Sequence, residues 1–474
     1  MNENPNLGAM QPHACPFSTP AGNGKSAPPI RAGLALIAGI FIACTLAARG
    51  EDTTAQEEPL PSSTDSTDYT MAETNAAPPP PSLPYPAAAY GSKEGVPGGE
   101  PVASGEPRRF HYRFGLTVRG VYDDNINISH TDRISDYYFA IEPWVTLGFG
   151  DIEGRGGDYI RLDYLPSFLI FVDHSDNDAV DHLIRLEARH QFSRLTLYLR
   201  QDVDILNNAN LNSFIDTTGQ QANIDVSTTT RLNLYVTRAR AYYDLTAKVF
   251  LSGEFDASIY DYTNDFINSE IFSGGLYINY KWTPKVTVGI GGTAGYDNVD
   301  DPNPDQTFEQ VNVRLSYEAT GKLNFYGSVG VEFRQFDGNR SERTSPTLEL
   351  GAMYHPFDGT TITLAASTLI LNSGFFPDQD FQATNVVLRI QQRMLQRVYL
   401  GLSAGYENAD YFATANGVSA PREDNYWFIE PSVDVLITRF LSAGAYYLHR
   451  RDDSSIAFFS FYDNQVGVRA TVRF

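Results

Sequence analysis

The 474-residue sequence predicts an all-β protein: a transmembrane antiparallel up-and-down β-barrel of about eighteen strands, with about sixteen as the alternative. Three observations predict this fold. The last ten residues, 465–474, alternate apolar and polar side chains and end in an aromatic residue, Phe474. The same alternation recurs along the chain from residue 110 onward. Finally, short connections alternate with long acidic ones, as they do in outer-membrane barrels.

Composition supports a barrel over a helical membrane protein. Tyr and Phe are abundant, at 28 and 29 residues, while hydrophobic residues make up only 42% of the chain. The interior has no apolar run of about 18 residues, which a membrane-spanning helix needs. The only cysteines are Cys15 and Cys44, so disulfide and thiol chemistry is not expected beyond the amino-terminal region. A net charge of −22 argues against nucleic-acid binding.

The amino-terminal residues predict a signal peptide and a linker. Lys25 and Arg31 precede an apolar run, residues 32–47, and small residues follow, which predicts a secretory signal peptide over residues 1–50. A retained membrane anchor is the alternative, and lipidation of Cys44 is a weaker one. Residues 51–108 are rich in Pro, Ala, Ser, Thr and Glu, so they predict a disordered periplasmic linker that precedes a barrel over residues 109–474.

The strands are predicted from side chains that point to opposite faces at alternate positions. In the first strand, residues 110–122, aromatic and aliphatic residues occupy the even positions except Gly120, and polar residues occupy most of the odd ones. The same pattern occurs at 194–205, 247–260, 310–319 and 323–334. The predicted strands start near residues 110, 137, 158, 181, 194, 228, 247, 268, 286, 307, 323, 344, 360, 382, 398, 425, 440 and 463.

The connections between these strands are of two kinds. A two-sheet sandwich gives no reason for such sorting, whereas a bacterial barrel has short periplasmic turns and long external loops. An open sheet edge has no partner in lipid, so the sheet is expected to close. The short connections lie near 193, 244, 282–285, 320–322, 355–359 and 437–439, and the long ones are 123–136, 172–180, 207–227, 297–306, 372–381, 407–424 and 451–462.

Aromatic residues near the predicted strand ends predict girdles at the lipid–water boundary. The ordinary preference of aromatic residues for strands is the alternative interpretation. An amphipathic last strand that ends in Phe474 resembles the closing strand of outer-membrane barrels, where it serves as a signal to the barrel-assembly machinery. The predicted girdle residues are Tyr137, Tyr138, Trp144, Tyr159, Tyr280, Trp282, Tyr426 and Trp427.

A short motif near the start of the barrel carries a family resemblance. The first strand ends in Gly120-Val-Tyr-Asp-Asp-Asn-Ile126, then come Ser135-Asp136 and an apolar strand that contains Glu142-Pro143. This arrangement resembles the putative β-barrel porin 2 family. The resemblance implies a location in the outer membrane of a Gram-negative-type bacterium, in contact with lipid and lipopolysaccharide. Some similar barrels accompany exopolysaccharide export.

The polar faces of the predicted strands carry charges of both signs into the lumen. Opposed rows of charge would create a transverse field that sorts solutes, while ion pairs that only stiffen the wall are the alternative. Inward tyrosines such as Tyr198, Tyr260 and Tyr326 would stack on sugars or simply fill the wall. The predicted pore-lining residues are Arg113, Arg119, Arg161, Arg185, Arg189, Arg200, Glu254, Asp256, Arg314, Glu318, Glu332, Arg334 and Arg469.

The functional expectation is a porin-like channel for passive diffusion of small hydrophilic solutes, with no cofactor. The alternative is a structural or export barrel for surface polysaccharide. The histidines are scattered without a Ser/His/Asp grouping, so no enzymatic activity is expected. Acidic loops at 297–305 and 173–182 offer oxygen ligands for calcium, but they lack EF-hand spacing. Loops 207–227 and 407–424 are long enough to constrict a pore, and a homotrimer is left open.

Overall fold

The computed structural model describes residues 110–152, 157–207, 225, 230–263, 266–320, 322–338 and 342–474. The predicted signal peptide, residues 1–50, and the predicted linker, residues 51–108, lie outside the described residues. Both therefore stay predictions.

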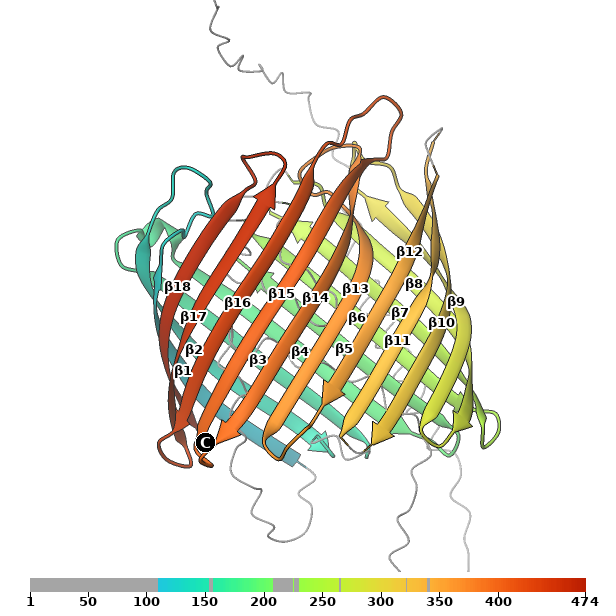
Figure 1. Ribbon diagram of the computed structural model, residues 1–474, viewed down its shortest axis with the longest axis horizontal. Coiled ribbons are helices and arrows are strands. Elements are labelled where there is room, and N and C mark those ends of the chain that lie inside the picture. Colours follow the sequence, from blue (N-terminus) through green and yellow to red (C-terminus); the bar gives the residue numbers. More distant parts are fainter. Residues whose placement is uncertain are drawn as a thin grey trace, which may run out of the picture. The chain divides into compact units, whose positions relative to one another are not determined.

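The described residues form one closed sheet of 18 antiparallel strands, because β1 pairs with both β2 and β18 (Figure 1). The predicted strand number of eighteen is confirmed, and the alternative of sixteen is wrong. The strands are β1 Phe110–Asp123, β2 Asp136–Gly150, β3 Tyr159–Phe171, β4 Ala179–Gln191, β5 Leu195–Leu206, β6 Leu232–Asp244, β7 Val249–Tyr262, β8 Ser269–Thr283, β9 Val286–Val299, β10 Gln306–Thr320, β11 Leu323–Phe336, β12 Arg343–Tyr354, β13 Thr360–Asn372, β14 Gln379–Met394, β15 Val398–Ala413, β16 Glu423–Leu436, β17 Leu441–Ser454 and β18 Phe461–Arg473.

The alternation in sequence becomes an apolar outer face and a polar inner face. In β18, Val466 and Val468 are exposed, whereas Gln465 and Arg469 are buried. In β1, Phe114 is exposed while Thr117 is fully buried and its Oγ1 lies 3.0 Å from the hydroxyl of Thr471. The exposed apolar residues thus form a belt around the barrel, as lipid contact requires.

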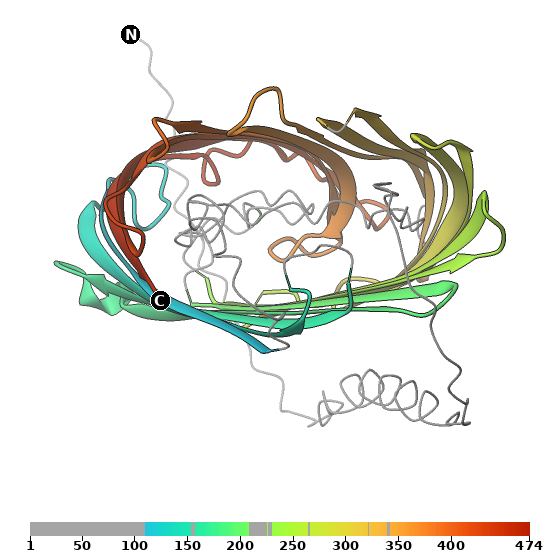
Figure 2. The same ribbon diagram turned by 90° about the horizontal axis from the view of Figure 1, so that it is seen from below.

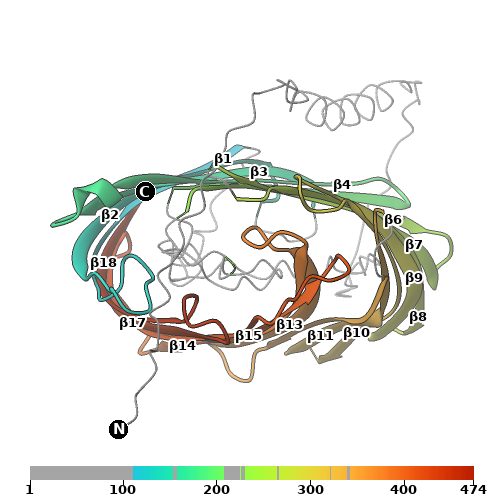
Figure 3. The same cartoon turned by 90° about the horizontal axis from the view of Figure 1, so that it is seen from above.

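The barrel has an oval cross-section, and the loop between β13 and β14, residues 373–378, reaches into its opening (Figures 2 and 3). A 3₁₀ turn, η1 Ser175–Asn177, lies in the connection between β3 and β4. Within the described ranges, no helix has the length and apolar character to cross a lipid bilayer.

The motif at residues 120–126 joins the first and last strands at their extracellular end. The Asn125 side-chain amide donates to the backbone oxygens of Ser129 and Tyr462, at 3.0 and 2.8 Å. Asp124 accepts from the backbone and side-chain nitrogens of Asn464, both at 2.8 Å, and Asp123 accepts from Gln465 at 3.0 Å. The motif therefore clamps the seam where the barrel closes.

Replacing Asn125 by alanine is expected to loosen this seam. The substitution leaves two backbone oxygens without their donor, and unsatisfied buried polar groups cost about 1–3 kcal/mol each. The folded barrel should therefore lose its resistance to SDS at a lower temperature, measured by heat-modifiable migration in gels. The exposed Asp132→Ala serves as the control, and an unchanged transition in Asn125→Ala would contradict the clamp.

The carboxy-terminal Phe474 lies at the other end of the same seam. Its backbone N–H donates to the Phe114 oxygen at 2.9 Å, and the two rings stack with centroids 5.2 Å apart. Its side chain is otherwise exposed on the outer surface. The aromatic end is thus accessible at the edge of the barrel, and its role as an assembly signal stays a prediction.

Two details of the sequence interpretation are wrong. Tyr138, Trp144 and Tyr426 are buried on the lumen side instead of lying in a girdle, while Tyr137 and Trp282 are exposed as predicted. Trp144 lies against Gly115 of the neighbouring strand, where an added Cβ would lie 2.5 Å from the indole ring. A glycine on one strand therefore makes room for an inward aromatic on the next.

The second correction concerns the loops. Strand β15 continues to Ala413 and β17 to Ser454, so the loops predicted at 407–424 and 451–462 are shorter than expected. The reason is visible in the alternation, which persists past residue 407: Glu407, Ala409 and Tyr411 are all buried on the lumen side. Acidic residues in this segment belong to strands and not to a solvated loop.

Candidate functional site in the lumen

Ion pairs between neighbouring strands cover much of the inner wall. Arg119 on β1 contacts Glu142 on β2, with Nη2 and Oε1 2.5 Å apart, and both side chains are buried. Arg119 also donates to the hydroxyl of Tyr446 at 3.2 Å. Arg185 on β4 donates to Asp202 on β5 at 2.8 Å. Such pairs hold charged side chains against the wall.

Other pairs form within one strand, because residues two apart share a face. The Nε atoms of Arg200 and Arg334 donate to Asp202 at 2.6 Å and Glu332 at 2.7 Å. Arg161 and Asp163 are separated by 2.8 Å. Because the two members of each pair are two residues apart in the sequence, their spacing alone predicts that they lie on the same face and can pair.

The alternation of the strands places all the predicted pore-lining residues on the lumen side. Ten of them take part in ion pairs with carboxylate or guanidinium groups of the described residues: Arg119, Arg161, Arg185, Arg200, Glu254, Asp256, Arg314, Glu332, Arg334 and Arg469. Arg113 and Glu318 lie exposed towards the periplasmic ends of their strands, and Arg189 donates to the Gly157 oxygen at 3.0 Å. Their part in conduction stays a prediction.

The Arg314–Glu254 pair joins strands that are three positions apart in the sheet, whereas Arg469 and Asp434 join β18 to β16, two positions apart. Arg314 on β10 donates through both terminal nitrogens to the two carboxylate oxygens of Glu254 on β7, the longer contact being 2.8 Å. Its guanidinium lies 3.3 Å above the ring of Tyr277 on β8. This pair therefore extends from β10 to β7 instead of following the ladder, and it narrows that side of the lumen.

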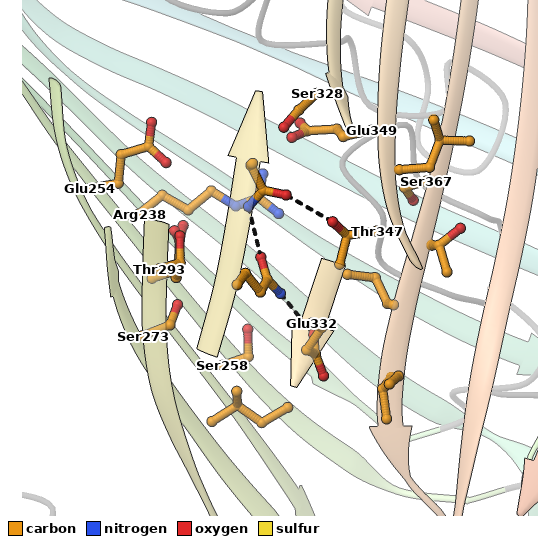
Figure 4. Close-up of a pocket in the computed structure, with 18 of the residues that line it drawn as sticks. Arg238, Glu254, Ser258, Ser273, Thr293, Ser328, Glu332, Thr347, Glu349 and Ser367 are labelled. Atoms are coloured by element: carbon orange, nitrogen blue, oxygen red, sulfur yellow. Dashed lines mark hydrogen bonds between the residues drawn. The ribbon is translucent and has the colours of Figure 1, made fainter. Parts of the chain in front are cut away.

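A cavity of about 400 Å³ surrounds this pair. Tyr198, Tyr260 and Tyr326 line it, as do Arg240 and Asp256, which lie 2.9 Å apart. Figure 4 shows Arg238 and Glu254 on one side of the cavity and Ser328, Glu349 and Ser367 on the other. The sequence interpretation omitted Arg240, although its spacing from Arg238 places both on one face.

The extracellular side is narrowed by three loops that meet at Asp225. This residue, which lies between β5 and β6, is buried. Its carboxylate accepts from the Ser373 hydroxyl at 3.0 Å, the Gly374 N–H at 2.6 Å and the Tyr411 hydroxyl at 2.8 Å. The loop at 373–378 is thereby held in its inward position. We call Asp225, Ser373, Gly374, Tyr411 and Arg422 the loop latch.

Arg422, just before β16, supplies the cation of the loop latch. Its Nη1 donates to the Asp225 backbone oxygen at 3.0 Å, its Nε donates to Asp424 at 2.8 Å, and its guanidinium lies 3.6 Å above the Phe459 ring. Burial alone would lower the pKa of Arg422, but Tyr411, Asp225 and Asp424 together raise it above its ordinary value. The guanidinium is therefore held in its charged form.

The sequence indicated two long loops as candidate constrictions: 207–227 contributes Asp225 to the loop latch, and 407–424 contributes Tyr411 and Arg422. Of the loop at 207–227, residues 208–224, 226 and 227 lie outside the described residues. Asp225 and Arg422 carried no mark of their role, because loop residues have no periodicity that would indicate a face or a partner. The inward loop at 373–378 was predicted only as an external connection.

Three carboxylates of the described residues lie close enough to hold a metal ion: Asp123, Asp124 and Asp463. They lie where the motif at residues 120–126 joins β1 to β18, and Asp463 also accepts a hydrogen bond from Arg450 at 2.5 Å. In the acidic loop at 297–305, Asp305 accepts from the Tyr296 hydroxyl at 2.6 Å and the Val299 N–H at 3.0 Å. Cation binding by the acidic loops stays a prediction.

Solved structures similar to this chain share little sequence identity with it, and one of them is described as an outer membrane protein. They include OpdK from Pseudomonas aeruginosa, with 10% identity, a TM-score of 0.38 and coverage of 77% of this chain and 98% of that chain. OccK2 (OpdF) from the same organism has 11% identity, a TM-score of 0.39 and coverage of 77% and 98%. OccAB3 from Acinetobacter baumannii has 13% identity, a TM-score of 0.39 and coverage of 77% and 99%. Similarities at this level identify no solute.

The sequence comparisons concern the carboxy-terminal part of the barrel. No curated protein matches this chain. A family model described as "Putative beta-barrel porin 2" matches residues 352–474, from the end of β12 through β18. This match confirms the resemblance predicted from the sequence: over residues 352–474 the chain resembles the putative β-barrel porin 2 family, and the described residues form a closed β-barrel with an apolar belt.

Proposed function

We propose that the barrel is a passive diffusion channel for small hydrophilic solutes, with a preference for neutral and zwitterionic ones. The observation that carries this proposal is the pairing of charges along the lumen. Around the Arg314–Glu254 pair, each charge lies next to its opposite, so the wall has strong local fields and little net charge. Such a lumen orients dipolar solutes without strongly rejecting either ion sign.

The tyrosines of the cavity support the same class of solute. Tyr198, Tyr260 and Tyr326 line a cavity whose lining also contains serine and threonine residues. An aromatic ring with a polar edge offers both an apolar face and a hydrogen-bonding group. Small polyhydroxylated or zwitterionic molecules would find matching groups there.

The size limit would be set by the loop latch. It holds residues 373–378 inside the opening, through the hydrogen bonds that Asp225 accepts from Ser373 and Gly374. A solute that passes this loop then meets the Arg314–Glu254 pair. Diffusion through such a path needs neither a cofactor nor a covalent step.

Conductance in planar lipid bilayers tests this proposal. The folded barrel should give discrete channel events in KCl with weak cation–anion selectivity. In liposome-swelling assays, glycine and a pentose should enter faster than a trisaccharide. A barrel that migrates as folded in semi-native gels but gives no channel events and no swelling would contradict the proposal. If deleting its gene also removed surface polysaccharide, an export role would be supported instead.

A further inference from the structure

The barrel wall is incomplete between β12 and β13. The ladder that joins them runs from Tyr354, opposite Ile362, to Glu349, opposite Ser367. Beyond Glu349, the described pairing of β12 continues with β11 alone, as far as Arg343, and that of β13 continues with β14, as far as Asn372. Two strand edges therefore diverge in the extracellular half of the barrel.

Pro346 lies in the diverging part of β12. Proline has no N–H to donate to a ladder, so it is confined to sheet edges, strand starts and bulges. Pro346 pairs with Val331 of β11 and has no pairing partner on β13, which is consistent with a free edge of β12 on the side of β13. The sequence therefore agrees with the divergence seen in the structure.

Contacts farther along the strands close this opening at its extracellular end. Arg343, on the lumen side of β12, donates to Gln382 on β14 at 3.3 Å, and its guanidinium lies 3.7 Å above the Phe412 ring on β15. By alternation, Gln382 shares its face with the exposed Val386, and Phe412 shares its face with the exposed Tyr406. The ends of β14 and β15 thus pass inside β12.

The opening is consequently a window with two closed ends. Its edges are residues 344–348 of β12 and residues 368–371 of β13. The paired residues Glu349 and Ser367 bound it on the periplasmic side. Arg343 and its contacts bound it on the extracellular side. We call this opening the lateral window.

The lateral window leads into the cavity around Arg314. Seven consecutive residues of β13, 365–371, line that cavity, together with residues 348–351 of β12. In a closed wall, alternate residues point away from the lumen. A run of consecutive lining residues occurs where both faces and the edge of a strand border the same space, so the free edge of β13 borders the cavity there.

The chemistry of the cavity changes across its width. Near the lateral window its lining is aliphatic, with Leu348, Leu350, Leu369 and Ile370. The opposite lining holds the Arg314–Glu254 and Arg240–Asp256 pairs. The cavity thus has an aliphatic side next to the membrane and a side lined by charge pairs farther from it. This arrangement suits a molecule with a hydrocarbon chain and an uncharged or zwitterionic polar head.

We propose that the lateral window admits such an amphipathic lipid from the outer leaflet, with its hydrocarbon chain between β12 and β13 and its polar head in the cavity. The free strand edges are compatible with this role, because irregular backbone at membrane depth occurs where it borders a cavity. The proposal does not depend on the diffusion of small solutes through the loop latch.

Photo-crosslinking in vesicles tests this proposal. The barrel, with Cys15→Ser and Cys44→Ser, is placed in phosphatidylcholine vesicles that contain a phosphatidylcholine with a diazirine on one acyl chain, close to the glycerol backbone. Mass spectrometry then locates the adducts. We expect adducts on the outward residues Val329 and Val331, which face lipid anyway, and also on Thr347 and Ser328 inside the cavity. Adducts on the outward residues alone would overturn the proposal.

A bridge across the lateral window provides the second measurement. The ladder between β12 and β13 ends at Glu349 and Ser367, so Leu348 and Thr368 would be the next pair if it continued. The double variant Leu348→Cys with Thr368→Cys therefore allows a disulfide or a short bismaleimide to join the two strand edges. Bridging should reduce the cavity adducts to the level of a sample without light, while the adducts on Val329 and Val331 remain. Reduction of the disulfide should restore the cavity adducts.

The control bridge uses the same two strands where they are already paired. Ala352→Cys with Leu364→Cys joins register partners on the periplasmic side of the window. Its oxidation should leave the cavity adducts unchanged. Cavity adducts that persist in the Leu348–Thr368 bridge would overturn the proposal. Channel conductance is recorded for the same samples, so that absence of conductance, which bears on diffusion, is distinguished from absence of lipid in the window.

Discussion

Replacing Asp225 by alanine is expected to open the extracellular mouth of the channel. The carboxylate accepts hydrogen bonds from Ser373, Gly374 and Tyr411 and contacts Arg422 at 3.4 Å. Removing one partner of a buried ion pair costs about 3–5 kcal/mol where the other charge is left without compensation; Arg422 keeps Asp424, so the loss here is expected to be smaller. The inward position of residues 373–378 would then lose its main support. Single-channel conductance should rise, and swelling assays should admit larger sugars than the native barrel does.

The control for this experiment is Asp176→Ala, which removes an exposed carboxylate from the turn η1. Its conductance should equal that of the native barrel. Arg422→Ala should act in the same direction as Asp225→Ala, because both remove one side of the same contact. Unchanged conductance and an unchanged size limit in both latch variants, with the barrel still folded, would show that the loop latch does not restrict the channel.

The strands were predictable because side chains of a membrane barrel alternate between the lipid face and the lumen face, so the sequence pattern repeats every two residues. Lipid requires an apolar residue at every second position, so β1 and β18 could be placed from residues 110–122 and 465–474 alone. The start of β6 was the least accurate, at 228 instead of Leu232, because it follows the longest loop. Pairs such as Arg200 and Asp202 were likewise implicit in their spacing.

Contacts between distant parts of the wall were not predictable in this way. Alternation assigns Gln382 and Thr384 to the outer face of β14, where polar side chains would be unfavourable in lipid. The structure resolves this conflict for Gln382, since it lies against Arg343 of β12. Polar residues on a face expected to meet lipid, together with Pro346 in a neighbouring strand, were the available signals of the lateral window.

The ion selectivity of the lumen is expected to move in opposite directions when either member of the Arg314–Glu254 pair is neutralised. Arg314→Ala leaves the carboxylate of Glu254 uncompensated and should favour cations, whereas Glu254→Gln leaves the guanidinium and should favour anions. One unit charge at about 4 Å is worth about 1 kcal/mol in water and about 4 kcal/mol near a protein surface. The permeability ratio should therefore change by about fivefold or more. Reversal potentials in a KCl gradient measure this change.

Two further variants separate the effect of the pair from that of charge in general. Glu318→Gln removes an exposed carboxylate near the periplasmic end of β10, where water screens it, and it should change the ratio little. The exchange Arg314→Glu with Glu254→Arg retains one charge of each sign at this place, so it should restore weak selectivity. Shifts of the same sign in both single variants would mean that the pair does not border the ion path. Opposite shifts, cancelled by the exchange, would locate the narrow part of that path between β7 and β10.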